Sequence, residues 1–213
     1  MPKTMTKLED LLDTLSALPA GGRRLVAIAG APGSGKSTLA DDLVARLNRR
    51  KPDAAAVIPM DGFHLDDGLL KARGTLSRKG APYTFDVGGL AAMLRRLSAN
   101  EEDEVIVPLF DRTLEISRAG ARAVPASIPL LLVEGNYLLL DEPGWSDLRA
   151  IFDLTVSLDV PFDVLERRLL QRWTDMGFAP EAAYAKAYEN DLPNAKTVID
   201  RSQPADIVFR PAG

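Results

Sequence analysis

The chain has 213 residues, of which 46% are hydrophobic and 26% charged, and its formal net charge is −4 at pH 7. This size fits one α/β domain, and the acidic balance excludes a global basic field that would hold nucleic acid or an anionic membrane. Without cysteine there are no disulfides or thiolate metal sites, which agrees with a cytoplasmic location. We therefore expect a single domain over residues 1–213, with neither nucleic acid nor membrane as a partner.

The first twenty residues predict a packing helix and carry no uninterrupted apolar core typical of a signal peptide. Thr6 and Glu9 stand at the positions of a capping box. Leucines recur at the spacing of one helix face: Leu8, Leu11, Leu12, Leu15 and Leu18.

The next segment predicts a βαβ unit. Residues 24–30 are a buried-strand pattern, Lys36 to Arg50 have the apolar period of a helix, and residues 54–60 form a second strand pattern that ends at Asp61. Such a crossover implies a parallel sheet that is covered on both faces.

Residues 62–86 predict a polar loop with one short helix, longer than a connector requires, and we expect it to serve a site. A helix pattern follows over residues 86–97, and residues 103–127 alternate like a pair of strands. The remaining strand and helix patterns lie at 128–135, 152–160, 161–173, 180–192 and 204–209. The whole predicts a doubly wound, five-stranded parallel sheet with helices on both faces, an inserted strand pair and a lid.

A glycine-rich segment between the first strand and the first long helix fits the phosphate-binding pattern G-x-x-x-x-G-K-[ST]. Its backbone N–H groups and the following helix end can hold a triphosphate, with Lys36 on the terminal phosphates and Ser37 on Mg²⁺. The alternative is a glycine-rich linker, but the strand and helix on either side favour nucleotide binding. The residues expected to bind the nucleotide are Gly30, Ala31, Pro32, Gly33, Ser34, Gly35, Lys36, Ser37 and Thr38.

Two acids follow neighbouring apolar strands. Asp61 and Glu134 are expected to converge near the γ-phosphate, because the carboxyl ends of parallel strands open onto one crevice. One can order the Mg²⁺ shell while the other accepts a proton from an attacking hydroxyl, so both are candidate metal residues. The alternatives are a turn cap at Asp61 and, at Glu134, a helix cap or an arginine pair.

Three further side chains have two open interpretations. Arg168 and Arg172 lie four residues apart on one helix face, where they either stabilise the transferred phosphoryl group or form a solvated basic face. His64, the only histidine, either bonds a substrate hydroxyl or orders the loop around it.

In the order and spacing of its motifs the chain resembles P-loop kinases of the uridine kinase, phosphoribulokinase and bacterial pantothenate kinase type. The resemblance covers almost the whole chain and is nearest to bacterial kinases described as fructose transport system kinases. The motifs are "GAPGSGKST", "MDGFH", "RKGAPYTFD", "PLFDR", "LLLVEGNYLLLD", "RRLLQRW", "NDLPNA" and "PADIVF".

The resemblance implies roles for several residues. Asp61 matches the catalytic acid that takes the acceptor's proton, Glu134 matches the acid associated with magnesium, and Arg168 and Arg172 fall in the lid helix. On the acceptor side, "DGFH" and "EGNY" depart from the uridine kinase pattern, which argues against uridine as the acceptor. The candidate acceptor-binding residues are His64, Tyr83, Phe85, Asp86, Arg112 and Tyr137. The aromatic members of this set are equally compatible with the core.

The expected function is ATP- and Mg²⁺-dependent transfer of a phosphoryl group to a hydroxyl of a small metabolite, which includes a sugar such as fructose. In this interpretation residues 62–86 form the acceptor side, and residues 162–192 form the lid. A nucleoside or pantothenate-like kinase is the alternative. A nucleotide-dependent switch is the alternative from another functional class. The residues from Asp86 match the D-x-x-G motif of such switches, but no apolar strand precedes them, and the chain has no N-K-x-D motif.

Overall fold

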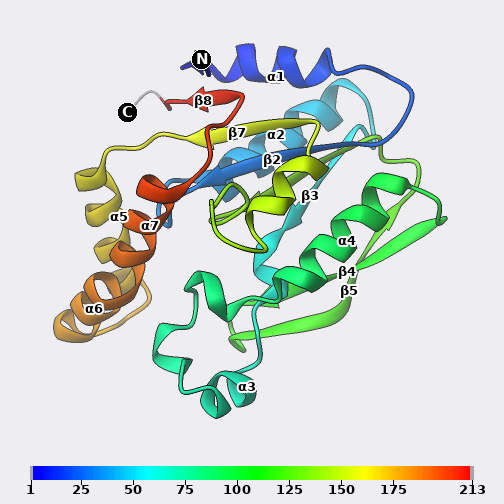
Figure 1. Ribbon diagram of the computed structural model, residues 1–213. Helices are drawn as coiled ribbons and strands as arrows, with labels where there is room; N and C mark the ends of the chain where they lie inside the picture. Colours follow the sequence, from blue (N-terminus) through cyan, green and yellow to red (C-terminus); the bar gives the residue numbers. More distant parts are fainter. Residues whose placement is uncertain (1, 212–213) are drawn as a thin grey trace.

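A six-stranded parallel sheet forms the centre of the fold (Figure 1), which a computed structural model describes for residues 2–211. Its strands, in spatial order, are β1 (Lys3–Met5), β8 (Ile207–Phe209), β7 (Leu154–Leu158), β2 (Arg24–Gly30), β6 (Leu130–Gly135) and β3 (Ala55–Pro59). All six residues of β6 are buried, as its continuous apolar sequence predicts for a central strand covered on both faces. The predicted doubly wound parallel sheet is confirmed.

Two helices cover one face of this sheet. They are α1 (Leu8–Ser16) and α2 (Lys36–Arg50), and their leucines pack on strand residues such as Val26 and Leu132. The helix predicted from Lys36 to Arg50 is confirmed with the same bounds.

The opposite face is covered by α4 (Val87–Ala99) and by an antiparallel pair, β4 (Glu104–Asp111) and β5 (Ile116–Pro125). Leu90 and Leu94 of α4 are fully buried in the larger of the two main core clusters. This confirms the predicted helix and the predicted inserted strand pair.

The N-terminal segment differs from its prediction in two respects. Residues 3–5 form a sixth strand, β1, which pairs in parallel with β8 at the sheet edge. Three residues are too short to show a strand period, so this strand could not be predicted from the sequence pattern. The capping box is also wrong, because α1 is preceded by Lys7 at its N-cap, with no side-chain cap. The helix is held by Leu11, Leu12 and Leu15, which are buried.

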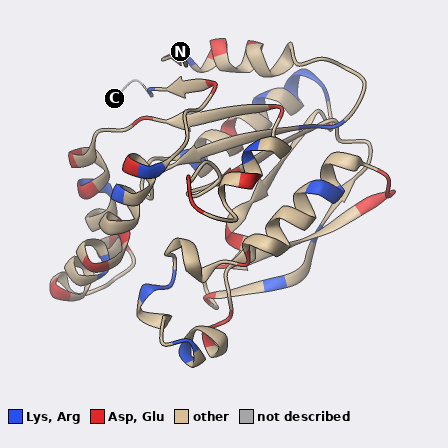
Figure 2. Cartoon of the chain, in the orientation of Figure 1, with Lys and Arg blue, Asp and Glu red and all other residues tan. Residues whose placement is uncertain are grey.

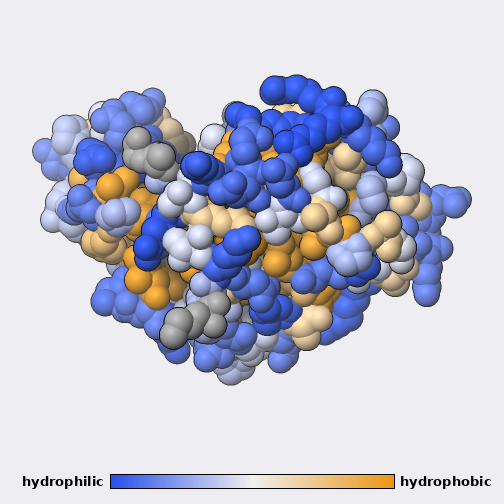
Figure 3. All heavy atoms as spheres, turned by 90° about the horizontal axis from the view of Figure 1, so that it is seen from above, coloured by the Kyte–Doolittle hydropathy of each residue, from blue (hydrophilic) through white to orange (hydrophobic). Residues whose placement is uncertain are grey.

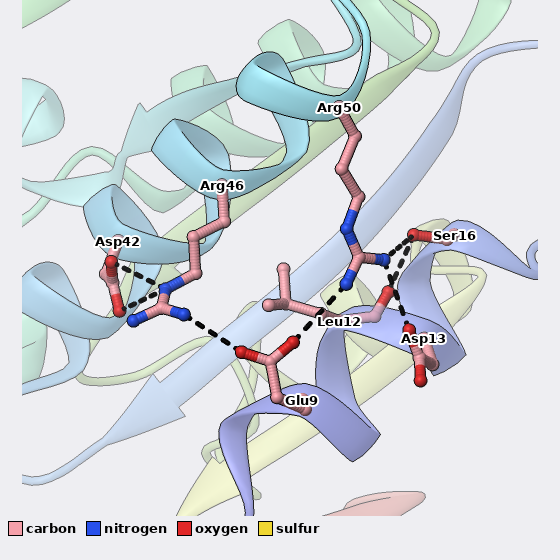
Figure 4. A network of polar contacts seen from close by, with 7 residues as sticks. All are labelled: Glu9, Leu12, Asp13, Ser16, Asp42, Arg46 and Arg50. Carbon is pink, nitrogen blue, oxygen red and sulfur yellow. Dashed lines mark hydrogen bonds and ion pairs between the residues drawn. The ribbon is translucent and has the colours of Figure 1, made fainter.

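Ion pairs join α1 to α2 at the surface (Figure 4). Arg46 bonds Asp42 on its own helix at 3.0 Å and Glu9 on α1 at 2.9 Å. Arg50 reaches Asp13 at 3.1 Å and Glu9 at 3.3 Å. Since these side chains are all more than a third exposed, the network adds little to the apolar contact beneath it.

The loop after β3 is more ordered than the sequence predicts. It contains the expected short helix, α3 (Asp67–Ala72), and also 3₁₀ turns at Met60–Phe63, Leu76–Arg78 and Pro82–Thr84. Three-residue turns have no apolar period, so sequence analysis could not detect them.

The predicted lid region consists of helices that Figure 1 draws on the left, beside the carboxyl end of the sheet. They are α5 (Phe162–Asp175), α6 (Pro180–Lys186) and α7 (Leu192–Arg201). A π-helical turn, Ala187–Asp191, links α6 directly to α7. The two helices predicted over residues 161–173 and 180–192 are confirmed, although the second continues to Arg201.

Acidic and basic residues are distributed over the whole fold. Figure 2 shows acidic and basic segments on most helices, and from above the hydrophobic surface is divided into small patches (Figure 3). Within residues 2–211, no helix has the length and apolar content needed to cross a membrane.

Candidate active site

The phosphate-binding segment joins β2 to α2 and is shaped by its glycines. Gly33 and Gly35 have φ angles of +78° and +90°, in the left-handed region that favours glycine. A Cβ at Gly30 would lie 2.7 Å from the Ser34 hydroxyl, so a side chain there would displace that hydroxyl. This conformation precedes the N-terminus of a 15-residue helix with no acid in its first turn, which suits an anion.

Two features of this loop favour a bound group. The buried hydroxyl of Ser34 has no hydrogen-bond partner among the described residues, although buried polar atoms usually have one. From α5, the Arg168 guanidinium donates to the carbonyl oxygens of Gly33 and Ser34, both at 3.3 Å. The predicted lid helix therefore contacts the predicted phosphate loop.

Two of the three residues predicted to hold magnesium, Ser37 and Glu134, lie together, whereas the third, Asp61, is paired with Arg112. Ser37 Oγ donates to Glu134 Oε2 at 2.9 Å, between the start of α2 and the end of β6. Glu134 is only 6% exposed, and its burial raises the pKa of the carboxyl while Lys36 lowers it. Because a buried carboxylate is stabilised by a cation, this pair fits a divalent ion that phosphate oxygens also contact. The described residues contain no group of three or more acidic, histidine or cysteine side chains arranged as a metal site.

Asp61 lies just beyond β3, in the turn Met60–Phe63, and is paired with an arginine. Arg112 Nη2, from the β4–β5 connection, donates to Asp61 Oδ2 at 2.9 Å. The Arg112 side chain is 59% exposed and the Asp61 side chain 21% exposed. The sequence suggested an arginine partner only for Glu134, as one of the alternatives. In the structure the arginine pairs with Asp61. The exposed arginine can move away without disturbing the core.

A cavity of about 390 Å³ is lined by Gly33 and Lys36 of the phosphate loop and by Asp61 and Arg112, but not by Ser37 or Glu134. Residues of the loop after β3 and of α5 to α7 complete its lining. The sequence candidates that it brings together are Pro32, Gly33, Lys36, Asp61, His64, Phe85, Arg112 and Arg172.

His64 is held in a defined tautomer inside this cavity. Its ring lies 4.1 Å from that of Phe85 and 4.6 Å from that of Phe110, and its Nδ1 is 2.8 Å from the Asp61 carbonyl oxygen. Since a carbonyl can only accept, Nδ1 carries the proton and Nε2 is left as an acceptor. Burial lowers the pKa of His64, which keeps the ring neutral.

Three candidate acceptor residues are not brought into the cavity. Tyr137 is fully buried, and its hydroxyl donates to the Gly80 carbonyl at 2.6 Å, so it supports the loop from beneath. The Asp86 carboxylate caps α4 through the Gly89 N–H at 2.9 Å. Tyr83 is 57% exposed and is not among the residues that line the cavity. In this structure Tyr137 is a core residue and Asp86 is a helix cap.

Sequence analysis did not select several polar residues of the cavity wall. Trp173 of α5 donates through Nε1 to Asp191 at 2.7 Å, and burial raises the pKa of Asp191. Asn190 holds the acceptor-side loop by donating to the Lys79 carbonyl at 2.8 Å. The signal was present in "NDLPNA", because Asn190 and Asn194 stand four residues apart. The cavity residues missed as site candidates include Asn136, Trp173, Lys186, Asn190, Asp191 and Asn194.

The comparison with protein families settles what kind of protein carries this site. The profile of the Phosphoribulokinase / Uridine kinase family matches residues 25–212. The chain belongs to this family. It is accordingly an ATP-dependent kinase, and the family usually employs Mg²⁺ with ATP.

Individual relatives agree with this family. A protein of Schizosaccharomyces pombe provisionally named uridine kinase C227.14 is 34% identical over 198 residues, 88% of this chain and 83% of its own length. The protein YggC of Escherichia coli K12 is 34% identical, over 93% of this chain and 82% of its length. The crystal structure of a protein provisionally named a fructose transport system kinase, from Silicibacter sp. TM1040, matches with a TM-score of 0.89 at 48% identity. That match covers 96% of this chain and 99% of the other.

Proposed function

We propose that this kinase transfers the γ-phosphoryl group of ATP to a hydroxyl of a small, neutral, polyhydroxylated metabolite, a sugar of the fructose class. One observation supports this above the others: a single cavity joins Lys36 of the phosphate loop to Asp61 and to the neutral acceptor nitrogen of His64. The name of the structural relative from Silicibacter points to the same class of acceptor.

The wall of the cavity suits hydroxyl groups. Asn136, Asn190 and Asn194 contribute neutral amides, and the buried Oδ1 of Asn136 has no donor among the described residues. The cation of Lys79 is neutralised by Asp67 at 2.7 Å. Beside charged residues such as Arg112, Lys186 and Asp191, these neutral amides supply donors and acceptors that the hydroxyl groups of a sugar can use.

A base-stacking site is less well supported. Phe85 and Phe110 both contact the His64 ring, and Phe85 is only 6% exposed. The Trp173 ring has the cations of Arg172 and Lys186 at 5.4 Å and 4.7 Å from its centroid. A nucleobase would need an open aromatic face, so a nucleoside acceptor is the second choice.

In the proposed reaction Asp61 accepts the proton of the acceptor hydroxyl. The hydroxyl oxygen forms a bond to the γ-phosphorus while the bond from that phosphorus to the β–γ bridging oxygen breaks, which releases ADP. Arg112, displaced from Asp61 when the acceptor enters, remains close enough to orient it. The carboxylate is then free to take the proton.

Cations of this chain stabilise the negative charge that develops on the transferred phosphoryl group. Lys36 and Arg172 line the cavity, and Arg168 contacts the phosphate loop from α5. Ser37 and Glu134 would hold Mg²⁺, which supplies charge neutralisation on the β- and γ-phosphate oxygens when bound. In this proposal residues 62–86 form the acceptor side and residues 162–192 form the lid that excludes water.

The direct test is a coupled ADP-release screen with fructose, other sugars, uridine and other nucleosides, and pantothenate, with the product identified by mass spectrometry. We expect saturable, acceptor-dependent ADP release with a sugar and a product heavier by one phosphoryl group. A nucleoside or pantothenate as the sole productive acceptor would refute the sugar assignment. Slow hydrolysis that no acceptor stimulates would favour a nucleotide-dependent switch.

A further inference from the structure

A second cavity lies at the end of the sheet opposite the phosphate loop. Its volume is about 680 Å³, and it is bounded by the carboxyl-terminal ends of α1 and α2, by residues 18–24 and by residues 126–130. Strand β2 begins beside it at Arg24 and ends at Gly30 in the phosphate loop, so the whole strand separates the two cavities. Figure 1 shows this end on the right, where the chain leaves α1 and enters β2.

The charged residues that line this cavity are all basic. They are Arg23, Arg24, Arg50 and Lys51, and no aspartate or glutamate is among the lining residues. This asymmetry differs from the rest of the molecule, whose net charge is −4. A group of cations around a cavity without an acid favours an anionic occupant.

Two of these cations already have carboxylate partners outside the cavity. Arg24 bonds Asp153 at 2.8 Å, and Arg50 bonds Asp13 on α1 at 3.1 Å, as Figure 4 shows for the second pair. Among the described residues, Arg23 and Lys51 have no acidic partner within ion-pair distance.

Arg23 is the more unusual of the two, because its side chain is buried without a counter-ion. The residue is 5% exposed, and its guanidinium donates to the carbonyl oxygens of Ile128 at 3.0 Å, Leu97 at 3.3 Å and Pro125. Burial lowers the pKa of Arg23, which reflects the cost of a charge removed from water. Carbonyl dipoles offset part of this cost, and an anion in the adjacent cavity would offset more.

The remainder of the wall is largely apolar. Leu15, Leu47 and Leu130 are buried in the core cluster beneath, and their side chains also line the cavity together with Leu18 and Pro129. The buried Oδ1 of Asn100, also in the wall, lacks a donor within residues 2–211. A ligand here would meet both apolar side chains and cations.

From these contacts we infer that the cavity between α1, α2 and the start of β2 is a binding site for a small organic anion with an apolar body. The chemistry is that of a carboxylate joined to a short hydrocarbon. The carboxylate lies toward Arg23 and Lys51, and the hydrocarbon lies against the leucines. This site is separate from the catalytic cavity and independent of the identity of the phosphoryl acceptor.

The test is a titration of the isotope-labelled full chain with sodium octanoate, followed by amide NMR. We expect saturable shifts of the Gly21, Gly22 and Lys51 amides, with Gly33 and Gly35 of the phosphate loop unchanged. Octanol lacks the charge and should bind about tenfold more weakly. Absence of saturable shifts at Gly21 and Gly22, or equal affinity for octanol, would overturn the assignment.

A charge reversal at Lys51 provides the matched test, since Lys51 is exposed and its replacement spares the fold. Lys51→Glu should weaken octanoate binding about tenfold, whereas Lys71→Glu, an exposed lysine of α3, should leave it unchanged. Equal weakening by both changes would show nonspecific charge attraction and contradict the site. If the shifts at Gly21 and Gly22 depend on protein concentration and not on octanoate, the occupant is a second copy of this chain. That result would also overturn the assignment of an organic-anion site.

Discussion

The proposed nucleotide side and the proposed acceptor side of the cavity are constructed differently. The phosphate loop is one continuous segment, Gly30 to Ser37, whose shape depends on backbone angles and on the start of one helix. The acceptor side is assembled from the turn at Asp61, the loop at Lys79, the β4–β5 connection and the segment from α5 to α7. A continuous segment fixes its own geometry, whereas a dispersed wall depends on the whole fold and can vary while the phosphate loop stays the same.

The largest expected effect is on the nucleotide side. Lys36→Ala should lower kcat on the order of a thousandfold, because it removes a cation from the oxygens of the transferred group. Steady-state ADP release with saturating MgATP and acceptor measures this. Lys7→Ala, at an exposed position just before α1, serves as the control and should retain full activity. Comparable activity in both variants would remove Lys36 from the mechanism.

We expect the KM for the acceptor to depend on pH through His64, an effect with no counterpart on the nucleotide side. The pKa of His64 lies below its ordinary value of 6.5 because the ring is buried. The neutral ring, which accepts a hydroxyl hydrogen bond, therefore persists as the pH falls past 6.5 and is lost only at lower pH. The KM for the acceptor should be flat above pH 6.5 and rise only at lower pH.

The control is His64→Gln, which keeps a hydrogen-bonding group but does not titrate. Its KM for the acceptor should be higher by about tenfold and should lose the rise at low pH. A KM that already rises between neutral pH and the ordinary histidine pKa in the wild type would contradict the buried, neutral ring.

The smallest effect concerns Tyr137, which supports the acceptor loop from the core. Tyr137→Phe removes the hydrogen bond to the Gly80 carbonyl and should lower the free energy of unfolding by about 1 kcal/mol. The KM for MgATP should remain unchanged. Denaturant unfolding and nucleotide titration measure the two quantities. A large loss of kcat with unaltered stability would instead favour direct contact between Tyr137 and the acceptor.

The sequence predicted the parts of this molecule that rest on local pattern. The strand before Gly30, the helix from Lys36 to Arg50 and the strand with Glu134 follow from apolar periodicity. Their parallel arrangement then brought Ser37 to Glu134, as the two strand ends implied.

The parts that failed depend on contacts distant in sequence. Tyr137 is buried because the loop at Gly80 folds over it, 57 residues away in the chain. The pairing of Asp61 with Arg112 joins segments 51 residues apart. Strand β1 exists only because β8 offers it an edge. In each case the partner, and not the local pattern, determines the structure.

The central claim is that Asp61 accepts the proton of the acceptor hydroxyl, and Asp61→Asn tests it most directly. The variant keeps the size of the side chain and removes its basicity. Calorimetry should give a Kd for a magnesium complex of a nonhydrolysable ATP analogue within about threefold of the wild type, while kcat with the productive acceptor falls about a thousandfold. Near-normal turnover in Asp61→Asn with intact nucleotide binding would contradict the account.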